Sequence, residues 1–596
     1  MTVLPDLWTS SHGYLHRDRL VREAMDQARG HALPVAREEI AQRLGQTKAR
    51  LVEKLRLAQP DHPLTLEFHG DISLVGYTIR RLSFDTAPGV RMTGNLYVPD
   101  GAGPFPAVLN LHGHWPQGKI CAHIQARGHI LARSGIVTLS VDAAGSGERS
   151  EIEREWSYHG ASKAAEMFLN GDSLLGLQVR ENRKALDVLQ SLGVVDSERI
   201  GATGASGGGN QTMWLAALDE RVKVAVPVVS VGSFQAYVGA RNCLCETLPG
   251  GLEISEEWGV LGLIAPRPLL VINAIHDQPA FHYEAMSPTC RQVQEIYALY
   301  GRRECFDSRL IDMVHGYCPP ALHAMLGWMR HWLSNVPGQA GTLPGWNAIP
   351  EDDLLCYPSG ERPSSVGYLQ ARQTLSVQSS GRSRQELAEL VGWTSPTAAG
   401  PWIEKGPLIG AITSPRGIPM PVLVSGDWGS LNGEIQVILS PAGKKSSFVL
   451  GHYQKGIEKN AFVMAIDLPG VGELAWETDE VAGARLHDTS RACLWLGYSL
   501  AIEWAEAITA ICLLLRAQFS EAEIQIIAEK EMVFGSILGL ALHPVPRVSL
   551  VEFDCPQSLR DLKGDSLVWY IPNFQRWGDL DSLRALAGVS QFSPNS

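Results

Sequence analysis

One serine in the sequence has the surroundings of an enzyme nucleophile. Ser206 is the centre of a G-x-S-x-G motif, Gly204–Gly208, within the stretch RIGATGASGGGNQTMWLAAL. The residues before the motif predict a strand, and the residues after it predict a helix. This order of strand, tight turn and helix presents a serine hydroxyl above the edge of a sheet, because flanking glycines avoid steric clashes in the turn. A simple glycine-rich turn is the alternative, but the context favours a nucleophile.

A serine nucleophile needs a general base, and the base needs an acid that orients it. Asp277 follows the apolar stretch PLLVINA, and His315 follows the later stretch RLIDMV. Open α/β sheets place their chemistry just after the carboxyl ends of strands, so we predict a triad of Ser206, Asp277 and His315. The alternatives are an ordinary turn aspartate and a surface histidine. Asp312 is the reserve acid, and we expect His276 to be a neighbour of the triad.

Two backbone N–H groups should stabilise the negative charge that develops on the carbonyl oxygen. One belongs to Gly207, the residue after the nucleophile, and the other to the loop after an earlier strand. The stretch LNLHGHW is such a loop, in which Gly113 permits the bend and the N–H of His114 is the expected second donor. His112 and His114 could instead indicate a metal site, but no third ligand is near them in the sequence.

Cys243 and Cys245 lie in an insertion between the predicted strands VKVAVPVV and PLLVINA. We interpret them as buried or pocket-lining thiols, because zinc would need two further ligands and nothing nearby has the spacing of a structural zinc site. We predict no metal ion and no cofactor. The insertion should help to shape the pocket, and ligand pockets are largely apolar and aromatic. The candidate substrate-binding residues are Trp115, Trp156, His159, Cys245 and Tyr317.

The elements around these residues predict an α/β fold. Residues 1–63 have a helical pattern, most clearly from about Val35 to Leu57, and from Leu64 the apolar period changes to two. Apolar strands separated by helices then follow, from AVLNLHG through IVTLSVD, RIGATG and VKVAVPVV to PLLVINA. This alternation predicts a mostly parallel, doubly wound sheet with helices on both faces.

The second half of the sequence repeats the first. VDAAGSGE at residues 141–148 recurs as IDLPGVGE at residues 466–473, and MWLAAL recurs as ILGLAL in nearly the same register. We therefore predict two tandem copies of one α/β unit. Lys530 replaces Ser206 in the second copy, and the sequence ends before a second acid and histidine. These features predict that the second copy is truncated, degenerate and structural.

The predicted domain boundaries follow these changes of pattern. An N-terminal helical segment covers residues 1–63, and the catalytic domain covers residues 64–333. Residues 334–383 are rich in Pro, Gly and Ser and are predicted to be a linker. Residues 384–596 form the degenerate second domain.

Five stretches in the first copy resemble, in order, the landmarks of the α/β-hydrolase superfamily. They are NLYVPDGAGPFPAVLNLHGHW, VDAAGSGER, GATGASGGGNQT, APRPLLVINAIHD and HGY. More closely, the sequence resembles the acetylxylan-esterase and prolyl-oligopeptidase-type branch, which includes large two-domain bacterial esterases. The resemblance covers about residues 64–333. It implies cofactor-free hydrolysis of carboxylic esters, with Ser206, Asp277 and His315 at the matching positions.

Three functions are compatible with these residues. The leading hypothesis is a serine carboxylesterase that acts on acetyl esters of carbohydrates or on small or xenobiotic esters. A prolyl-oligopeptidase-type peptidase is the alternative within enzymes, weakened because no segment of several hundred residues is left for a β-propeller. The third is a non-catalytic binding or scaffolding protein.

Composition excludes several classes of protein and disfavours several kinds of partner. Of 596 residues, 45% are hydrophobic and 19% are charged, which excludes a disordered chain and a coiled-coil rod. The net charge of −12 argues against a broad nucleic-acid-binding surface. No uninterrupted apolar stretch reaches the ~18 residues of a membrane span, and the most apolar one contains Glu503 and Glu506. Ten scattered cysteines and the lack of a signal-peptide pattern predict a cytoplasmic protein. The sequence is compatible with a homo-oligomer.

Overall fold

The structure is a computed structural model that describes most of the chain. The described residues are 7–8, 12–58, 62–151, 162–336, 341–367, 383–406, 408–428, 433–481, 483–562 and 566–588. The chain divides into two compact units. The first unit comprises residues 25–167 and 172–376, and the second comprises residues 1–24, 168–171 and 377–596.

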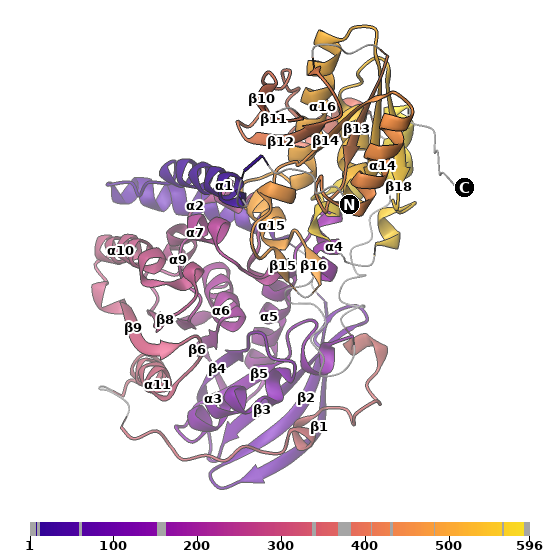
Figure 1. The fold of residues 1–596 in the computed structure, drawn as a ribbon. Coiled ribbons are helices and arrows are strands. Elements are labelled where there is room, and N and C mark those ends of the chain that lie inside the picture. The colour runs from indigo at the N-terminus through magenta and orange to yellow at the C-terminus, as the bar shows by residue number, and fades with distance from the viewer. Residues whose placement is uncertain are drawn as a thin grey trace. The chain divides into compact units, whose positions relative to one another are not determined.

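Nine strands form the sheet of the first unit, in the order β1-β2-β3-β5-β4-β6-β7-β8-β9 (Figure 1). The pairs from β1 to β5 are antiparallel, and the strands from β5 through β4 to β9 run parallel. The mixed sheet agrees with the predicted change from alternating strands to apolar, buried ones. The strands are β1 (Leu66–Leu74), β2 (Tyr77–Ala87), β3 (Val90–Pro99), β4 (Phe105–Leu111), β5 (Val137–Val141), β6 (Val195–Ala205), β7 (Val222–Val228), β8 (Leu269–His276) and β9 (Phe306–Val314).

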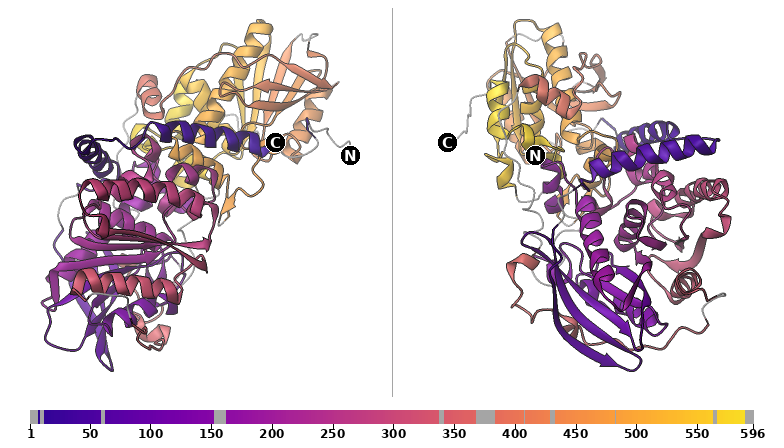
Figure 2. Two further views of the ribbon diagram at one scale, coloured as in Figure 1. Left: turned by 90° about the vertical axis from the view of Figure 1, so that its left-hand side faces the viewer. Right: turned by 180° about the vertical axis from the view of Figure 1, so that it is seen from behind.

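Helices cover both faces of this sheet (Figure 2). Helices α3 (Ala122–Ala132) and α11 (Pro319–Ser334) share one hydrophobic cluster with the central strands, which includes Ile130, Val226 and Met325. Helices α5 (Leu174–Ser191) and α6 (Gly207–Leu218) pack against each other and against β6. The other helices of this unit are α2 (Arg37–Lys54), α7 (Phe234–Gly239), α8 (Gly251–Ile254), α9 (Glu257–Gly262) and α10 (Tyr283–Leu299), and the short α4 (Glu166–Leu169) is divided between the two units after Met167.

The parallel strands bring the predicted site residues to one edge of the sheet. Strands β4 and β6 are neighbours, as are β8 and β9, and β7 lies between the two pairs. His114 follows β4, Ser206 follows β6, Asp277 follows β8 and His315 follows β9. The carboxyl ends of parallel strands lie at the same edge, so all four residues start from that edge.

The second unit has seven strands in the order β10-β11-β12-β14-β13-β17-β18. Its strand order and pairing directions equal those of β1 to β7 in the first unit. Within the described residues, no strand extends this sheet beyond β18, where β8 and β9 lie in the first unit. The strands are β10 (Ile403–Gly406), β11 (Ile409–Thr413), β12 (Pro419–Val424), β13 (Glu434–Leu439), β14 (Phe462–Ile466), β17 (Glu523–Glu529) and β18 (Val548–Phe553), beside the small pair β15 (Glu480–Val481) and β16 (Ala484–Arg485).

The second unit contains an apolar helix that the sequence analysis predicted to be buried. Helix α16 (Leu500–Gln518) is buried over most of its length, including Glu503 and Glu506. No single helix in the described ranges is long and apolar enough to cross a membrane; α15 (His487–Trp495) and α16 pass that test only as a pair, bent by 91°. The remaining helices are α1 (Gly13–Arg29), of which the part up to Ala24 belongs to this unit, α13 (Arg384–Val391), α14 (Ser447–Glu458), α17 (Glu531–Leu542), α18 (Phe574–Trp577) and α19 (Leu580–Ala587).

Each unit contains the same buried cluster of one lysine and two carboxylates. In both units, the side-chain ammonium of the lysine contacts both carboxylates. The backbone N–H of the same lysine donates to the aspartate, at 2.8 Å in the first unit and 2.6 Å in the second. The clusters consist of Lys119, Asp142 and Glu148 in the first unit and of Lys444, Asp467 and Glu473 in the second. The acidic members lie in the repeated motifs VDAAGSGE and IDLPGVGE, so the repeat preserves a structural feature that the sequence analysis did not identify.

The units differ from the predicted domain boundaries in two places. Residues 341–367, predicted as part of the linker 334–383, pack into the first unit, where Leu354 and Leu355 join a cluster with Tyr77. The guanidinium of Arg81 also donates to the carbonyl oxygen of Leu355. The predicted helical segment 1–63 is divided between the two units after Ala24. Isolated apolar residues among prolines and glycines carry no periodicity, which is why the sequence pattern missed this packing.

Candidate active site

Ser206 occupies a strained turn between β6 and α6. Its backbone has φ +58° and ψ −127°, and its N–H donates to the carbonyl oxygen of Val228 at 2.9 Å. A Cβ atom at Gly204 would lie 2.5 Å from the carbonyl oxygen of Leu111, and one at Gly208 would lie 2.4 Å from it. Both glycines are therefore needed for the close approach to β4. This is the geometry that the G-x-S-x-G motif predicts.

His315 and Asp277 are joined directly. The Nδ1 atom of His315 lies 2.7 Å from Oδ1 of Asp277, whose side chain is fully buried, whereas the imidazole is 35% exposed. The ring also stacks on Phe281, with 5.9 Å between centroids. Asp312, the reserve acid of the sequence analysis, is instead 3.1 Å from His276 in an exposed pair. The structure thus brings Asp277, and not Asp312, to His315.

The proposed nucleophile Ser206 and the proposed base His315 are not hydrogen-bonded in this structure. Among the residues that the structure describes, no hydrogen bond joins the hydroxyl of Ser206 to His315. Catalytic hydrogen bonds are often long without substrate and tighten only in the reacting complex.

The loop after β4 lies directly against the turn that holds Ser206. A Cβ atom at Gly113 would lie 2.9 Å from the carbonyl oxygen of Ala205 and 3.2 Å from the nitrogen of Gly207. Only glycine therefore permits this approach. The arrangement brings His114 beside Gly207, the two residues whose N–H groups were predicted to bind the oxyanion.

His112 has a different environment from His114. It is fully buried, its Nε2 atom accepts a hydrogen bond from the N–H of Ala143 at 3.1 Å, and its Nδ1 atom lies 2.8 Å from the carbonyl oxygen of Gly113. Burial lowers the pKa of this imidazole, and the nearby Asp142 only partly opposes the effect. Both ring nitrogens are engaged within the fold, so the two histidines do not form a joint metal site.

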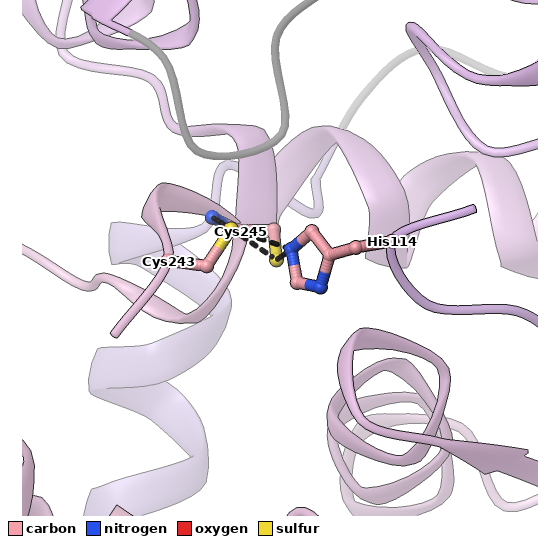
Figure 3. Close-up of side chains that lie close together, drawn as sticks. All are labelled: His114, Cys243 and Cys245. Carbon is pink, nitrogen blue, oxygen red and sulfur yellow. Dashed lines mark hydrogen bonds between the residues drawn. The ribbon is translucent and has the colours of Figure 1, made fainter. Parts of the chain in front are cut away.

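His114 instead meets the two cysteines of the insertion (Figure 3). Its Nε2 atom lies 2.8 Å from Sγ of Cys243 and 3.6 Å from Sγ of Cys245, and the two sulfurs are 3.0 Å apart. A Cβ atom at Gly207 would lie 3.4 Å from Cε1 of His114 and 3.6 Å from Sγ of Cys245. The cluster therefore borders the predicted oxyanion site, and these three side chains are the ones in the described chain that could hold a metal ion.

The electrostatics of this cluster are dominated by burial and by the thiols. Burial lowers the pKa of His114, but the charge of the Cys243 thiolate and its hydrogen bond outweigh burial and raise the pKa to about 9. Glu246, which the sequence analysis missed, accepts a hydrogen bond from the N–H of Cys243 at 3.2 Å. Burial raises the pKa of Glu246 to about 7. Its position directly after Cys245 was the available signal.

The predicted substrate-binding residues have different environments. Trp115 is 41% exposed and stacks on His123 with 5.2 Å between ring centroids. The hydroxyl of Tyr317 lies 2.9 Å from that of Thr203, and the guanidinium of Arg127 lies 4.7 Å from its ring centroid. These contacts favour a packing role for Tyr317 over the predicted substrate contact. Cys245 lies beside Gly207, as described above, and the predicted residues Trp156 and His159 lie outside the described residues.

Known proteins resemble the first part of the chain. Residues 51–236 match the family model of acetyl xylan esterases (AXE1). "Putative hydrolase YtaP" of Bacillus subtilis (strain 168) is 29% identical over 258 residues, which cover 39% of this chain and 80% of that protein.

A comparison with solved structures also finds esterases at lower sequence identity. The methylesterase BT1017 covers 59% of this chain and 75% of its own, with 22% identity and a TM-score of 0.46. A glucuronoyl esterase from Solibacter usitatus covers 47% of this chain and 91% of its own, with 14% identity and a TM-score of 0.38. The match over residues 51–236 relates the first unit to the acetyl xylan esterases, a family of carboxylic ester hydrolases.

Proposed function

We propose that the first unit is a serine carboxylesterase in which Ser206 is the nucleophile, His315 the general base and Asp277 the residue that orients the base. The observation that carries this proposal is the 2.7 Å contact between Nδ1 of His315 and Asp277, together with the strained turn at Ser206. The acid fixes the tautomer in which Nε2 of His315 can accept a proton.

The chemistry follows from these positions. The hydroxyl oxygen of Ser206 attacks the ester carbonyl while its proton passes to Nε2 of His315. The N–H groups of Gly207 and His114 stabilise the oxyanion, an effect that is ~3–4 kcal/mol per donor in comparable sites. His315 then protonates the leaving alkoxide, and water hydrolyses the acyl-enzyme with the same residue as base. Asp277 stays ionised throughout and stabilises the imidazolium.

The proposed substrates are acetyl esters of carbohydrates or other small esters. The acetyl xylan esterase match over residues 51–236 supports this choice. Trp115, exposed at the same edge as the predicted oxyanion loop, offers a flat apolar face on which a sugar ring could stack.

A substrate panel tests the proposal. Purified protein is assayed with p-nitrophenyl acetate, longer p-nitrophenyl esters, acetylated xylan and a dipeptide anilide. We expect turnover of the short esters and a loss of about 10⁴-fold or more in Ser206→Ala. Cleavage of the anilide alone would instead indicate a peptidase, and turnover of no substrate would favour a binding or scaffolding role. Activity of Ser206→Ala within about tenfold of wild type would contradict the proposed nucleophile.

We further propose that the second unit is a degenerate copy of the same fold without a catalytic role. Lys530 lies between β17 and α17 with φ +52° and ψ −129°, close to the values of Ser206. The strand order, the buried lysine–carboxylate cluster and this turn support a common origin of the two units. A lysine in place of the serine cannot form the ester-linked acyl-enzyme that water hydrolyses.

A further inference from the structure

The cluster of His114, Cys243 and Cys245 has no part in the proposed acyl transfer beyond the backbone N–H of His114. The side chains come from two loops, one after β4 and one in the insertion after β7, and the three ligand atoms all lie within 4.8 Å of one another. The nitrogen and the two sulfurs face one another in Figure 3. We propose that they form a binding site for a thiophilic divalent metal ion, with Zn²⁺ as its representative.

The ligand types and distances suit such an ion. Zinc binds thiolate at about 2.3 Å and imidazole at about 2.0–2.1 Å with tetrahedral geometry, which puts two sulfurs about 3.8 Å apart. The sulfurs are now 3.0 Å apart, and Nε2 of His114 lies 2.8 Å and 3.6 Å from them. Each ligand atom needs to move by less than about 1 Å, which rotation of the two cysteine side chains can supply.

Neighbouring groups form hydrogen bonds with the two cysteines. The N–H of Cys245 donates to Sγ of Cys243 at 3.4 Å, a contact that stabilises thiolate charge. The amide of Asn210, in the helix after the nucleophile, donates to the carbonyl oxygen of Cys245 at 3.0 Å. Such hydrogen bonds around the ligands orient a metal site and raise its affinity.

The competing explanation is an imidazolium–thiolate pair that needs no metal. The raised pKa of His114 fits both explanations, because a thiolate favours any cation beside it. Cys245 distinguishes the two explanations. A proton shared between His114 and Cys243 does not require Cys245, whereas metal coordination does. Metal binding would displace the Nε2 proton and the thiol protons, so it would release protons to the solvent.

The position of the site connects metal binding with the proposed esterase activity. With three ligands among the described residues, a tetrahedral ion has a fourth position that water or a substrate oxygen can take. The cluster borders Gly207, so an ion there would lie beside the oxyanion site and would change ester turnover. The proposal itself does not depend on esterase activity, and binding is therefore measured without substrate.

The test uses reduced, metal-free, full-length protein titrated with Co²⁺, whose thiolate complexes absorb in the near ultraviolet, followed by competition with Zn²⁺. We expect one equivalent to bind with a thiolate band that Zn²⁺ abolishes. Cys243→Ser and Cys245→Ser should each weaken Zn²⁺ binding by more than about 100-fold, beyond the effect of losing an outer partner. Cys290→Ser is the matched control, because this buried thiol lies in α10 away from the cluster.

Folding of each variant is checked by circular dichroism, and His114→Asn provides a third variant that keeps both thiols. Weakened binding in the folded cysteine and histidine variants supports the site. Absence of a thiolate band in wild type, or unchanged affinity in Cys245→Ser, would overturn the proposal and leave the imidazolium–thiolate pair as the explanation. Neither result bears on Ser206, so the proposed esterase function stands or falls separately.

Discussion

Asp277 accepts a hydrogen bond from Nδ1 of His315 at 2.7 Å through a side chain that is entirely buried. Its other carboxylate oxygen, Oδ2, has no hydrogen-bond partner among the described residues. A buried carboxylate with so few donors interacts strongly with a positive charge that appears next to it. It is therefore placed to stabilise His315 when the imidazole takes a proton.

Asp277→Asn should lower kcat/KM by about 10⁴-fold, because the amide favours the wrong imidazole tautomer while keeping the shape of the side chain. Asp312→Asn is the matched control. Its carboxylate is 83% exposed and contacts His276, so we expect less than a twofold change. Ester hydrolysis measured for both variants shows which aspartate orients His315. Equal losses of activity would show that the 2.7 Å contact is not the catalytic one.

Gly113→Ala should impair catalysis by crowding the turn at Ser206, because the added Cβ would also lie 3.2 Å from Cβ of Ser206. The added Cβ would lie 2.9 Å from the carbonyl oxygen of Ala205, so the loop that carries His114 must move away from Gly207. A displacement near 1 Å at a reacting centre can cost about 100-fold in rate, and we expect a fall in kcat of that order. Gly193→Ala serves as control because nothing lies within 4 Å of its new Cβ. Unchanged kcat in Gly113→Ala would show that this loop does not contribute to the oxyanion site.

Local patterns in the sequence were sufficient for the elements that carry the triad. The turn at Ser206 is specified by its own glycines, and the apolar runs before Asp277 and His315 form β8 and β9 as predicted. Neighbouring parallel strands then place these residues at one edge whatever the details of packing. The choice of Asp277 over Asp312 also followed from its position just beyond a strand end.

Contacts between distant loops could not be predicted in the same way. His114 and Cys243 are far apart in the sequence, and each alone formed an incomplete metal motif; only the folded insertion brings them together. Tyr317 was predicted to line the pocket because its side chain is aromatic, yet its hydroxyl contacts Thr203 in β6. The packing of residues 341–367 against the first unit depends on the path of the chain after α11, and no periodic sequence pattern predicts that path.

Replacing the residue in the strained turn of either unit by glycine should stabilise the protein. Ser206 and Lys530 have φ +58° and +52°, a conformation that costs a non-glycine residue ~1–3 kcal/mol. Part of this gain is lost to the greater freedom of glycine when unfolded, so we expect Ser206→Gly and Lys530→Gly each to raise the free energy of unfolding by about 1 kcal/mol. Urea denaturation measures the change.

The alanine variants provide the controls for this comparison. Ser206→Ala and Lys530→Ala retain a Cβ atom and therefore the strain, so neither should gain stability. Only the Ser206 variants should lose ester turnover, because Lys530 has no part in the proposed reaction. A Lys530→Ala protein that folds but no longer hydrolyses esters would place chemistry in the second unit. Destabilisation by Lys530→Gly would show that the lysine side chain itself stabilises this turn.

Glu503 links helix α1 to α16 inside the second unit. Its carboxylate is 2.8 Å from the Arg19 guanidinium and 3.2 Å from Nε2 of His16, and it is almost fully buried. Burial alone would raise its pKa, but the charges of Arg19 and His16 outweigh burial and hold the pKa well below the usual range. A depressed carboxyl pKa contributes stability that is complete above the usual value of about 4.3 and is lost as the pH falls through the folded-state pKa.

Glu503→Gln should therefore destabilise the second unit by about 3 kcal/mol at pH 7, because it leaves the mostly buried Arg19 without its main counter-charge. The difference from wild type should shrink once the pH falls below about 4, where the unfolded carboxyl binds a proton and wild type loses the same contribution. Glu23→Gln is the control, since Glu23 contacts the same guanidinium at 2.8 Å from a more exposed position on the same helix and should contribute less than about 0.5 kcal/mol. Urea denaturation at pH 7 and near pH 3.5 measures both variants. A destabilisation by Glu503→Gln that is equal at the two pH values would mean that shape or hydrogen bonding, and not the charge of Glu503, holds α1 in this unit.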